Sequence, residues 1–373
     1  MSSNGMNSNT TTSAIAGTTK AVINLSACRH NLSIAKESSP GSKLIAVIKA
    51  NAYGHGMLNI ANALTEADAF AVARMSEAVE LRGAGISKPI LLLEGFTSEE
   101  ELNLVREYQL ECVIHHETQL ALLEQAKGDA ITIWVKVDTG MHRLGFNPDD
   151  IKNICQRLEK NQVIKLPVKL MTHLANADDK HDDKTLKQLD VFYKSIEGLS
   201  VDETSIANSA GILGWPQSHA NWNRPGIMLY GVSPFINSKA SDHNLKPVMT
   251  LSSKLIAVKH LKKDETIGYG GSYTCEKDMT IGVVAIGYGD GYPRHAISGT
   301  PVLVNNKRCS LVGRVSMDMI CVDLNNQADA KVGDPVVLWG EDLPIEEIAE
   351  CADTIAYELT CGVTSRVDLV YSD

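Results

Sequence analysis

The sequence predicts an α/β protein in which a (β/α)8 barrel is followed by a smaller, mostly β domain. Between about residues 43 and 232, short apolar runs alternate with longer segments whose apolar positions recur every three or four residues, as strands alternate with helices. There are eight such runs, the number that a closed parallel barrel of this kind requires. After about residue 245 the apolar runs are separated by Gly, Asn and Pro, which indicates β structure joined by turns. A doubly wound sheet is the alternative for the first part, but it rarely needs eight units.

The eight predicted barrel strands are short and rich in aliphatic residues. In chain order they are LIAVIK (44–49), AFAVA (69–73), PILLLE (89–94), ECVIH (111–115), ITIWVKVD (131–138), VKLMTHL (168–174), TSIANS (204–209) and GIMLYG (226–231). The segments between them include TSEEELNLVREY (97–108) and HDDKTLKQLDVFYKSIE (181–197), which have a helical spacing of apolar residues.

The second domain is predicted from five β-like runs and one late helix. The runs are KLIAVKHL (254–261), TIGVVAIGYGDG (280–291), TPVLVNNK (300–307), ICVDL (320–324) and DPVVLWG (334–340), and the helix lies near IEEIAECA (345–352). We place the boundary near HNLKPVMT (243–250). The expected organisation is a disordered leader (1–19), a barrel (20–245) whose leading strand packs on the second domain, and a mostly β domain (246–373).

Composition restricts the classes of function. The formal net charge of -10 argues against nucleic-acid binding, which requires basic surfaces. No run of about eighteen apolar residues occurs, so no membrane span is expected. The eight cysteines form no C-x-x-C pair, which favours reduced thiols in a cytoplasmic protein and offers no metal site. The polar first twenty residues do not resemble a secretory signal.

Five polar residues are predicted at one mouth of the barrel. Lys49 ends the first strand, Arg143 follows the fifth, His173 closes the sixth, Ser209 closes the seventh and Arg224 precedes the eighth. Each alone has an ordinary explanation, such as a core histidine, a helix cap or a surface charge. Catalytic groups of such barrels lie at the C-terminal ends of the strands. The predicted convergence of these five residues at that end therefore favours an active site.

The residue types in this group indicate a particular cofactor. A lysine at a barrel mouth suits Schiff-base formation with a carbonyl. The RPGI stretch (224–227) offers the backbone N–H groups of Gly226 and Ile227, and the hydroxyls of Ser209 and Tyr53 complete a plausible phosphate seat. A ligand that carries both a carbonyl and a phosphate points to pyridoxal 5'-phosphate.

Eight motifs in this order resemble those of the alanine racemases, pyridoxal-phosphate enzymes with a barrel followed by a β domain. The most specific is the cofactor-lysine signature AVIKANAYGHG (46–56). The others are WVKVDTGMHRLGF (134–146), MTHLANAD (171–178), IANSAG (206–211), RPGIMLYG (224–231), TIGYGGSYT (266–274), VVAIGYGDGYPR (283–294) and GRVSMDM (313–319). The resemblance covers about residues 20 to 373. Ser316 stands where cysteine is common in relatives, and no departure affects a proposed catalytic position.

The resemblance implies a role for each residue of the cofactor site. Lys49 would hold the cofactor as a Schiff base and act as one catalytic base. Arg224 would face the pyridine nitrogen, with His173 behind it. The phosphate would be held by the remaining group, Tyr53, Ser209, Tyr357 and the backbone of Gly226 and Ile227.

The resemblance also implies that the site is shared between two subunits of a homodimer. Tyr269 of the second subunit would be the other base. Arg143 and the second subunit's Met317 N–H would hold the substrate carboxylate, and Tyr288 would line the entrance, with Asp318 in the same surroundings. Lys136 is either carbamylated, as in many family members, or an ordinary lysine in a salt bridge.

The expected activity is therefore the interconversion of L- and D-alanine by two bases, supplying D-alanine for peptidoglycan. A racemase for another amino acid, such as serine, lysine or arginine, is the nearest alternative. A pyridoxal-phosphate carrier barrel would lack the β domain. A related decarboxylase would carry a catalytic cysteine near its end and a pyridine partner other than Arg224.

Overall fold

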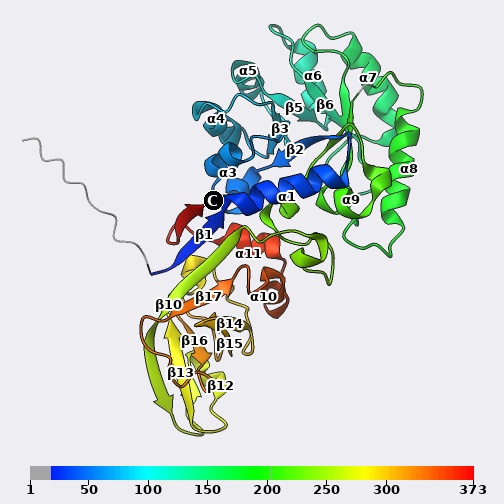
Figure 1. Cartoon of the computed structure of the whole chain (residues 1–373). Helices are drawn as coiled ribbons and strands as arrows, with labels where there is room; N and C mark the ends of the chain where they lie inside the picture. Colours follow the sequence, from blue (N-terminus) through cyan, green and yellow to red (C-terminus); the bar gives the residue numbers. More distant parts are fainter. Residues whose placement is uncertain (1–17, 202) are drawn as a thin grey trace, which may run out of the picture.

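The computed structural model describes residues 18–201 and 203–373, and almost all of the predicted leader lies outside the described residues. Figure 1 shows an upper α/β part and a lower, mostly β part, joined where β1 (Lys20–Asn24) meets the long strand β10 (Met249–Leu261). None of the helices in the described ranges is both long and apolar enough to cross a membrane.

The upper part is a closed parallel barrel of eight strands, β2 to β9. The strands are β2 (Lys43–Val47), β3 (Ala69–Val72), β4 (Ile90–Leu92), β5 (Glu111–Ile114), β6 (Ile133–Lys136), β7 (Lys169–Met171), β8 (Thr204–Ser205) and β9 (Trp222–Asn223). Each strand pairs in parallel with the next, and β9 closes the ring on β2. The predicted fold class, a (β/α)8 barrel followed by a mostly β domain, is confirmed.

Helices surround the barrel because their sequences place apolar residues on one face. In α7 (Ile151–Glu159), Ile151, Ile154 and Leu158 are buried, which is the spacing of a single helical face. The others are α1 (Leu25–Ser38), α3 (Met57–Ala63), α4 (Met75–Gly83), α5 (Glu99–Glu107), α6 (Glu117–Gln125), α8 (Lys184–Ile196) and α9 (Ser209–Gly214).

The prediction of the eighth strand was wrong in position. The GIMLYG segment forms the 3-10 helix η3 (Ile227–Tyr230), and the eighth strand is the two-residue β9 before it. All four residues of η3 are buried, so the segment has no polar face that would distinguish a helical turn from a buried strand. Arg224 consequently follows the eighth strand instead of preceding it, which puts Arg224 at the same barrel end as Lys49.

The other seven barrel strands are all shorter than the predicted runs, so three site residues lie beyond their strands. His173, predicted to close the sixth strand, follows β7, which ends at Met171. Lys49 lies beyond β2, at the start of α2 (Lys49–Tyr53). Ser209 lies beyond β8, at the start of α9, where Asn208 caps the helix by accepting a hydrogen bond from Gly211 N. Lys49 and Ser209 are therefore the first residues of helices at the barrel mouth and do not belong to the strands themselves.

The lower part is an eight-stranded sheet that includes the first and last strands of the described chain. Strand β1 pairs antiparallel with β10 and parallel with β18 (Asp368–Ser372). The remaining strands of the sheet are β13 (Met279–Val284), β14 (Pro301–Val304), β15 (Lys307–Ser310), β16 (Ile320–Asp323) and β17 (Pro335–Trp339). A separate hairpin is formed by β11 (Thr266–Ile267) and β12 (Tyr273–Thr274).

Two helices follow β17, whereas the sequence predicted one. The predicted helix is α10 (Ile345–Cys351), and the second is α11 (Ala356–Gly362). The second helix has only seven residues and no side-chain cap, so it lacks the usual start signal. It matters for the site because it carries Tyr357.

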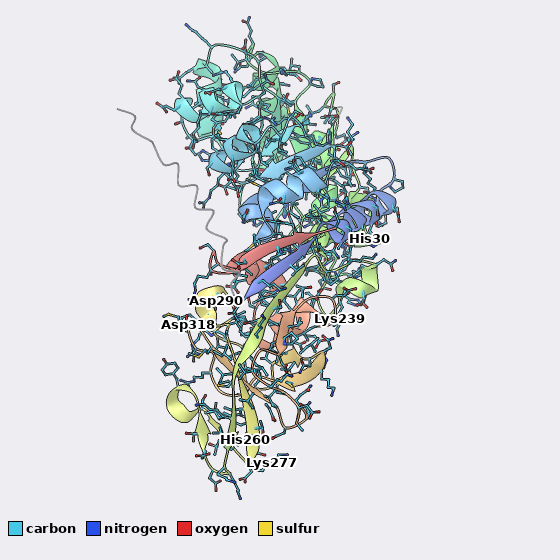
Figure 2. All side chains as sticks on the ribbon, turned by 60° about the vertical axis from the view of Figure 1, so that its left-hand side comes forward. His30, Lys239, His260, Lys277, Asp290 and Asp318 are labelled. Carbon is cyan, nitrogen blue, oxygen red and sulfur yellow. The ribbon has the colours of Figure 1, made fainter. Side chains whose placement is uncertain are left out.

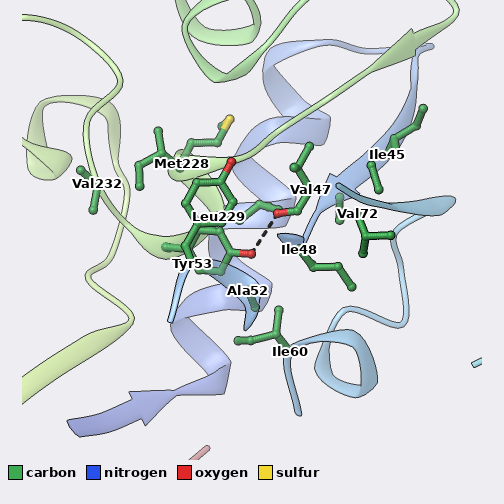
Figure 3. Close-up of a cluster of buried hydrophobic side chains, with 14 of the residues drawn as sticks. Ile45, Val47, Ile48, Ala52, Tyr53, Ile60, Val72, Met228, Leu229 and Val232 are labelled. Carbon is green, nitrogen blue, oxygen red and sulfur yellow. Dashed lines mark hydrogen bonds between the residues drawn. The ribbon is translucent and has the colours of Figure 1, made fainter. Parts of the chain in front are cut away.

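The core beneath the barrel mouth fixes the end of β2. Figure 3 shows Ile45, Val47 and Ile48 packed among buried side chains from η3 and α2. Tyr230 Oη donates a hydrogen bond of 2.9 Å to the carbonyl of Val47, two residues before Lys49. The segment that carries Lys49 therefore begins directly after residues that are held in the packed core.

Candidate active site

A cavity of about 1200 Å³ opens at the C-terminal ends of the barrel strands. Ten of the residues that the sequence singled out line it: Lys49, Tyr53, Lys136, Arg143, His173, Ser209, Arg224, Gly226, Ile227 and Tyr357. They come from segments far apart in the sequence and from both parts of the chain. The convergence expected at the barrel mouth is thus present in the structure.

Lys49 is the amine of this cavity. Burial lowers its pKa below the usual value, and the charge of Arg143 lowers it further, while Glu94 and Glu77 act in the opposite direction. A lowered pKa increases the fraction of neutral amine near neutral pH. Lys49 is therefore suited to act as a nucleophile and as a base.

Ser209, Tyr53 and Gly226 form one wall with hydrogen-bond donors close together. Ser209 Oγ accepts hydrogen bonds from Gly226 N at 2.9 Å and Met228 N at 3.3 Å, so its own O–H remains able to donate. A Cβ added to Gly226 would lie 2.9 Å from Tyr53 Oη. Glycine therefore keeps this wall open for a ligand, and burial raises the pKa of Tyr53, so its hydroxyl stays a donor.

Arg224 is almost fully buried, with 3 % of its surface exposed. Its guanidinium donates to Ser205 Oγ at 2.5 Å, to the Thr172 carbonyl at 2.6 Å and to the Ile206 carbonyl at 3.1 Å. Burial lowers the pKa of Arg224 to about 10, which leaves it charged near neutral pH. A fixed, charged donor group therefore faces the cavity.

His173 lies beside Arg224, with Nδ1 3.4 Å from Arg224 Nη2. Burial and the charge of Arg224 hold the pKa of His173 well below its usual range. The imidazole is therefore neutral, and it contributes no further positive charge to the cavity wall.

Lys136 and Arg143 add positive charge to the cavity. Burial, and then the charges of Arg224, Arg143 and Lys49 in that order, together lower the pKa of Lys136 to about 8. Within the described ranges Lys136 has no ion pair with an acidic side chain. The acidic side chains that also line the cavity include Glu94. Lys49, Lys136, Arg143 and Arg224 nevertheless gather at the barrel mouth, where they suit the phosphate and carboxylate groups of an anionic ligand.

Four predicted site residues do not line the cavity: Tyr269, Tyr288, Met317 and Asp318. They form a separate group on the β domain, here called the β-domain group. Tyr269 is 68 % exposed. Backbone hydrogen bonds join the Tyr288 and Met317 loops, with Gly289 N donating to the Met317 carbonyl at 2.9 Å.

Arg366 ties these two loops together. It pairs with Asp290 Oδ1 at 3.1 Å and with Asp318 Oδ1 at 2.7 Å, and Figure 2 shows both aspartates at one edge of the β domain. The loops of Tyr288 and Met317 are therefore exposed but held together in a defined arrangement.

Other cavity residues were missed by sequence reasoning. Glu94 follows β4, and the predicted strand PILLLE ended on it, so the strand-end rule could have found it. Cys361 also lines the cavity, but it lies on α11, a helix that has no start signal in the sequence. Glu77 Oε1 accepts a hydrogen bond of 2.6 Å from Ala50 N, a contact that no local pattern indicates.

Comparison with known proteins gives consistent results over both parts of the chain. The family model described as alanine racemase, N-terminal domain, matches residues 23–234, and alanine racemase, C-terminal domain, matches residues 248–371. The biosynthetic alanine racemases of Escherichia coli O6:H1 and of Escherichia coli K12 are each 52% identical to this chain over 354 residues. Those alignments cover 94% of this chain and 98% of each relative.

Solved structures agree with this assignment. The crystal structure of the biosynthetic alanine racemase from Pseudomonas aeruginosa has a TM-score of 0.93 and 42% identity, covering 95% of this chain and 99% of the other. Alanine racemase from Acinetobacter baumannii has a TM-score of 0.90 and 38% identity at the same coverage. The fold, the cavity residues and these similarities lead to one conclusion: the chain belongs to the alanine racemase family, whose members depend on pyridoxal 5'-phosphate.

Proposed function

We propose that this protein interconverts L- and D-alanine using pyridoxal 5'-phosphate. The observation that carries the proposal is the meeting of Lys49, Ser209 and Arg224 in one cavity of a chain that belongs to this family. These groups have the chemistry needed at the aldehyde, the phosphate and the pyridine nitrogen of the cofactor.

The residues present fit that cofactor. The amine of Lys49 would bind the aldehyde carbon of the cofactor, and Arg224 would face its pyridine nitrogen, with His173 beside Arg224. Tyr53, Ser209, Tyr357 and the backbone of Gly226 and Ile227 would hold its phosphate. The fit is supported by the wall at Gly226, where a side chain would meet the Tyr53 hydroxyl, and backbone N–H groups suit a phosphate. When bound, pyridoxal phosphate withdraws electrons from the Cα atom of an attached amino acid and so acidifies its proton.

Two bases then move the proton at Cα. Racemisation removes it from one face and returns a proton to the other, so a single fixed base is poorly placed for both steps. Lys49 acts on one face, and Tyr269 acts on the other. Tyr269 lies outside the cavity of its own chain and is largely exposed, so we propose that it acts in the cavity of a second copy within a homodimer.

The same second copy completes substrate binding. Arg143 pairs with the substrate carboxylate, as a guanidinium fork suits this planar anion, and the backbone N–H of the second copy's Met317 adds a further donor. We propose that Lys136 is carbamylated. Its lowered pKa leaves neutral amine to react with CO2, and the resulting anion would position Arg143.

Two tyrosines set the size of the substrate. Tyr357 lines the cavity, and Tyr288 of the second copy would close the entrance, with Asp318 beside it. Little more than a methyl group would then fit, which favours alanine over serine or lysine. A pyridoxal-phosphate carrier is disfavoured because residues 248–371 match the racemase C-terminal domain.

The test is chiral chromatography of L-alanine after incubation with the purified protein and pyridoxal phosphate, with L-serine, L-lysine and L-arginine in parallel. D-alanine is expected well ahead of the other D-isomers. If another D-isomer forms first, the substrate assignment is wrong. If no D-isomer forms although the cofactor is bound, the carrier alternative holds instead.

The cellular assignments are part of the same proposal. We propose a cytoplasmic enzyme that supplies D-alanine for peptidoglycan, with a leader (1–19), a barrel domain (20–245) and a β domain (246–373). The eight cysteines lie in the described part of the chain without disulfides, which fits a reducing compartment.

A further inference from the structure

The segment that follows Lys49 has an unusual backbone. Ala50, Asn51, Ala52 and Tyr53 all have φ between 52° and 53°, so α2 is a left-handed turn built from L-residues other than glycine. This conformation, in which the Cβ atom of an L-residue crowds its own backbone, is sterically unfavourable at each position. It persists only where surrounding contacts hold it, and this turn carries Tyr53 directly behind Lys49.

One side chain binds the carbonyl groups of this turn. His55 Nδ1 lies 3.0 Å from the Ala52 carbonyl oxygen and 2.9 Å from the Tyr53 carbonyl oxygen. Both partners are acceptors, so Nδ1 carries the proton and donates to them. Among the described residues His55 Nε2 has no hydrogen-bond partner, so this single neutral tautomer satisfies the geometry.

The ring of His55 is itself held in place. It is fully buried and stacks on Tyr230, with ring centroids 4.6 Å apart and an interplanar angle of 29°. Tyr230 in turn donates to the Val47 carbonyl. His55 is therefore linked to the chain on both sides of Lys49, at Val47 before it and at the turn after it.

The β domain encloses His55 from the other side. A side chain at Gly54 would collide with the Thr360 carbonyl, and one at Gly56 would collide with the Tyr371 hydroxyl. His55 lies between these glycines and shares a cavity of about 10 Å³ with Thr360 and Trp339. The imidazole thus has little room to turn away from the carbonyl groups it binds.

We propose that His55 is a positioning residue for the cofactor site: its Nδ1–H group holds the left-handed turn that directs the Lys49 amine and the Tyr53 hydroxyl into the cavity. The inference rests on the proposed function, because Lys49 and Tyr53 matter through pyridoxal phosphate. Burial lowers the pKa of His55 to about 4, so the ring stays neutral near neutral pH.

The test compares two substitutions that separate hydrogen bonding from packing. His55→Asn keeps a nitrogen donor near the Nδ1 position but loses ring volume, whereas His55→Phe keeps a ring against Tyr230 and loses the donor. Pyridoxal phosphate is titrated into each apo-protein by fluorescence, and amide hydrogen exchange is followed over residues 50–56. His55→Phe is expected to bind the cofactor roughly tenfold more weakly and to exchange faster. His55→Asn is expected to stay within about threefold of wild type.

Two further variants complete the experiment: one is a control, and the other replaces His55→Phe if that protein does not fold. His219→Asn is the matched control, since His219 Nε2 binds the Ile212 carbonyl at 2.9 Å and neither residue lines the large cavity; its cofactor affinity should be unchanged. If His55→Phe does not fold, His55→Gln replaces it, because its amide reaches the Nε2 position and leaves the carbonyl groups without their donor. Equal affinity for His55→Phe and His55→Asn would overturn the inference, whereas failure of wild type to bind the cofactor would overturn the proposed function.

Discussion

In the proposed site, Arg224 would have the most direct influence on the outcome of the reaction. Its guanidinium has donor groups only, and its contacts to Ser205, Thr172 and Ile206 fix its position. A ring nitrogen facing it must act as an acceptor and stay unprotonated. The electron-withdrawing power of the ring is then limited, which favours return of the proton at Cα over side reactions.

Replacing Arg224 with a carboxylate tests this role. Arg224→Glu is expected to slow racemisation by roughly 10- to 1000-fold and to increase transamination, because a carboxylate would stabilise a protonated pyridine nitrogen. The products to measure are pyruvate and pyridoxamine phosphate beside D-alanine. Arg224→Lys, which keeps the charge, is the control, and an Arg224→Glu variant without extra pyruvate would disprove the role.

Lys136 provides a prediction on pH. Because its pKa is lowered to about 8 in the folded protein and is higher in the unfolded chain, the unfolded state binds more protons between these values. The contribution of Lys136 to folding stability therefore rises as the pH increases through that window.

The measurement is urea unfolding of apo-protein in CO2-free buffer at several pH values above 7. The free energy of unfolding of wild type relative to Lys136→Met should increase from about pH 8 to pH 10. Added bicarbonate should raise the intact mass by one CO2 in wild type only. If the difference in unfolding free energy between wild type and Lys136→Met stayed constant across this range, the pKa of Lys136 would not be lowered in the folded protein.

At the scale of elements, the far end of the barrel is closed by a cluster of charges and indoles. Lys169 Nζ lies 3.3 Å from Glu111 Oε1 and 2.9 Å from Glu203 Oε2. It also lies 4.9 Å from the Trp134 ring centroid and 5.3 Å from that of Trp222. One lysine thus links β5, β6, β7 and β9 at the ends opposite the cavity.

Lys169→Met should destabilise the protein without changing the chemistry. The Lys169 side chain is 16% exposed, and its loss leaves two carboxylates facing each other, so we expect a cost of about 1–3 kcal/mol in unfolding free energy. Lys43, which is 56% exposed and binds the same Glu203, gives the matched control, with an expected cost below about 1 kcal/mol for Lys43→Met. A changed kcat in Lys169→Met, or equal costs for the two, would contradict this view.

The barrel strands and the contacts around Lys49 show which features could be predicted from the sequence and which could not. The first seven barrel strands were found because each is an apolar run that ends near a polar residue. The eighth was displaced onto η3, since a short run buried on all sides gives no periodic signal. The contact of Ala50 with Glu77 and that of His55 with the turn carbonyl groups depend on tertiary packing, so no local pattern could reveal them.

At the scale of the molecule, each chain carries two incomplete sets of residues. The cavity holds Lys49 and the proposed cofactor-binding groups, whereas the β-domain group holds Tyr269 and Met317, which are both exposed. Within one described chain these sets do not share a cavity. Two copies that exchange their β-domain groups would complete two sites, as expected of a two-fold symmetric dimer.

Subunit complementation is the measurement that tests this account most directly. Lys49→Ala and Tyr269→Phe proteins are assayed for D-alanine formation from L-alanine, first alone and then after mixing, dissociation and reassembly in equal amounts. Each alone should be nearly inactive, whereas hybrid dimers should contain one intact site, restoring about a quarter of wild-type activity on random mixing. Hybrid dimers without restored activity, or a Tyr269→Phe protein that racemises at the wild-type rate, would contradict an active site shared between two subunits.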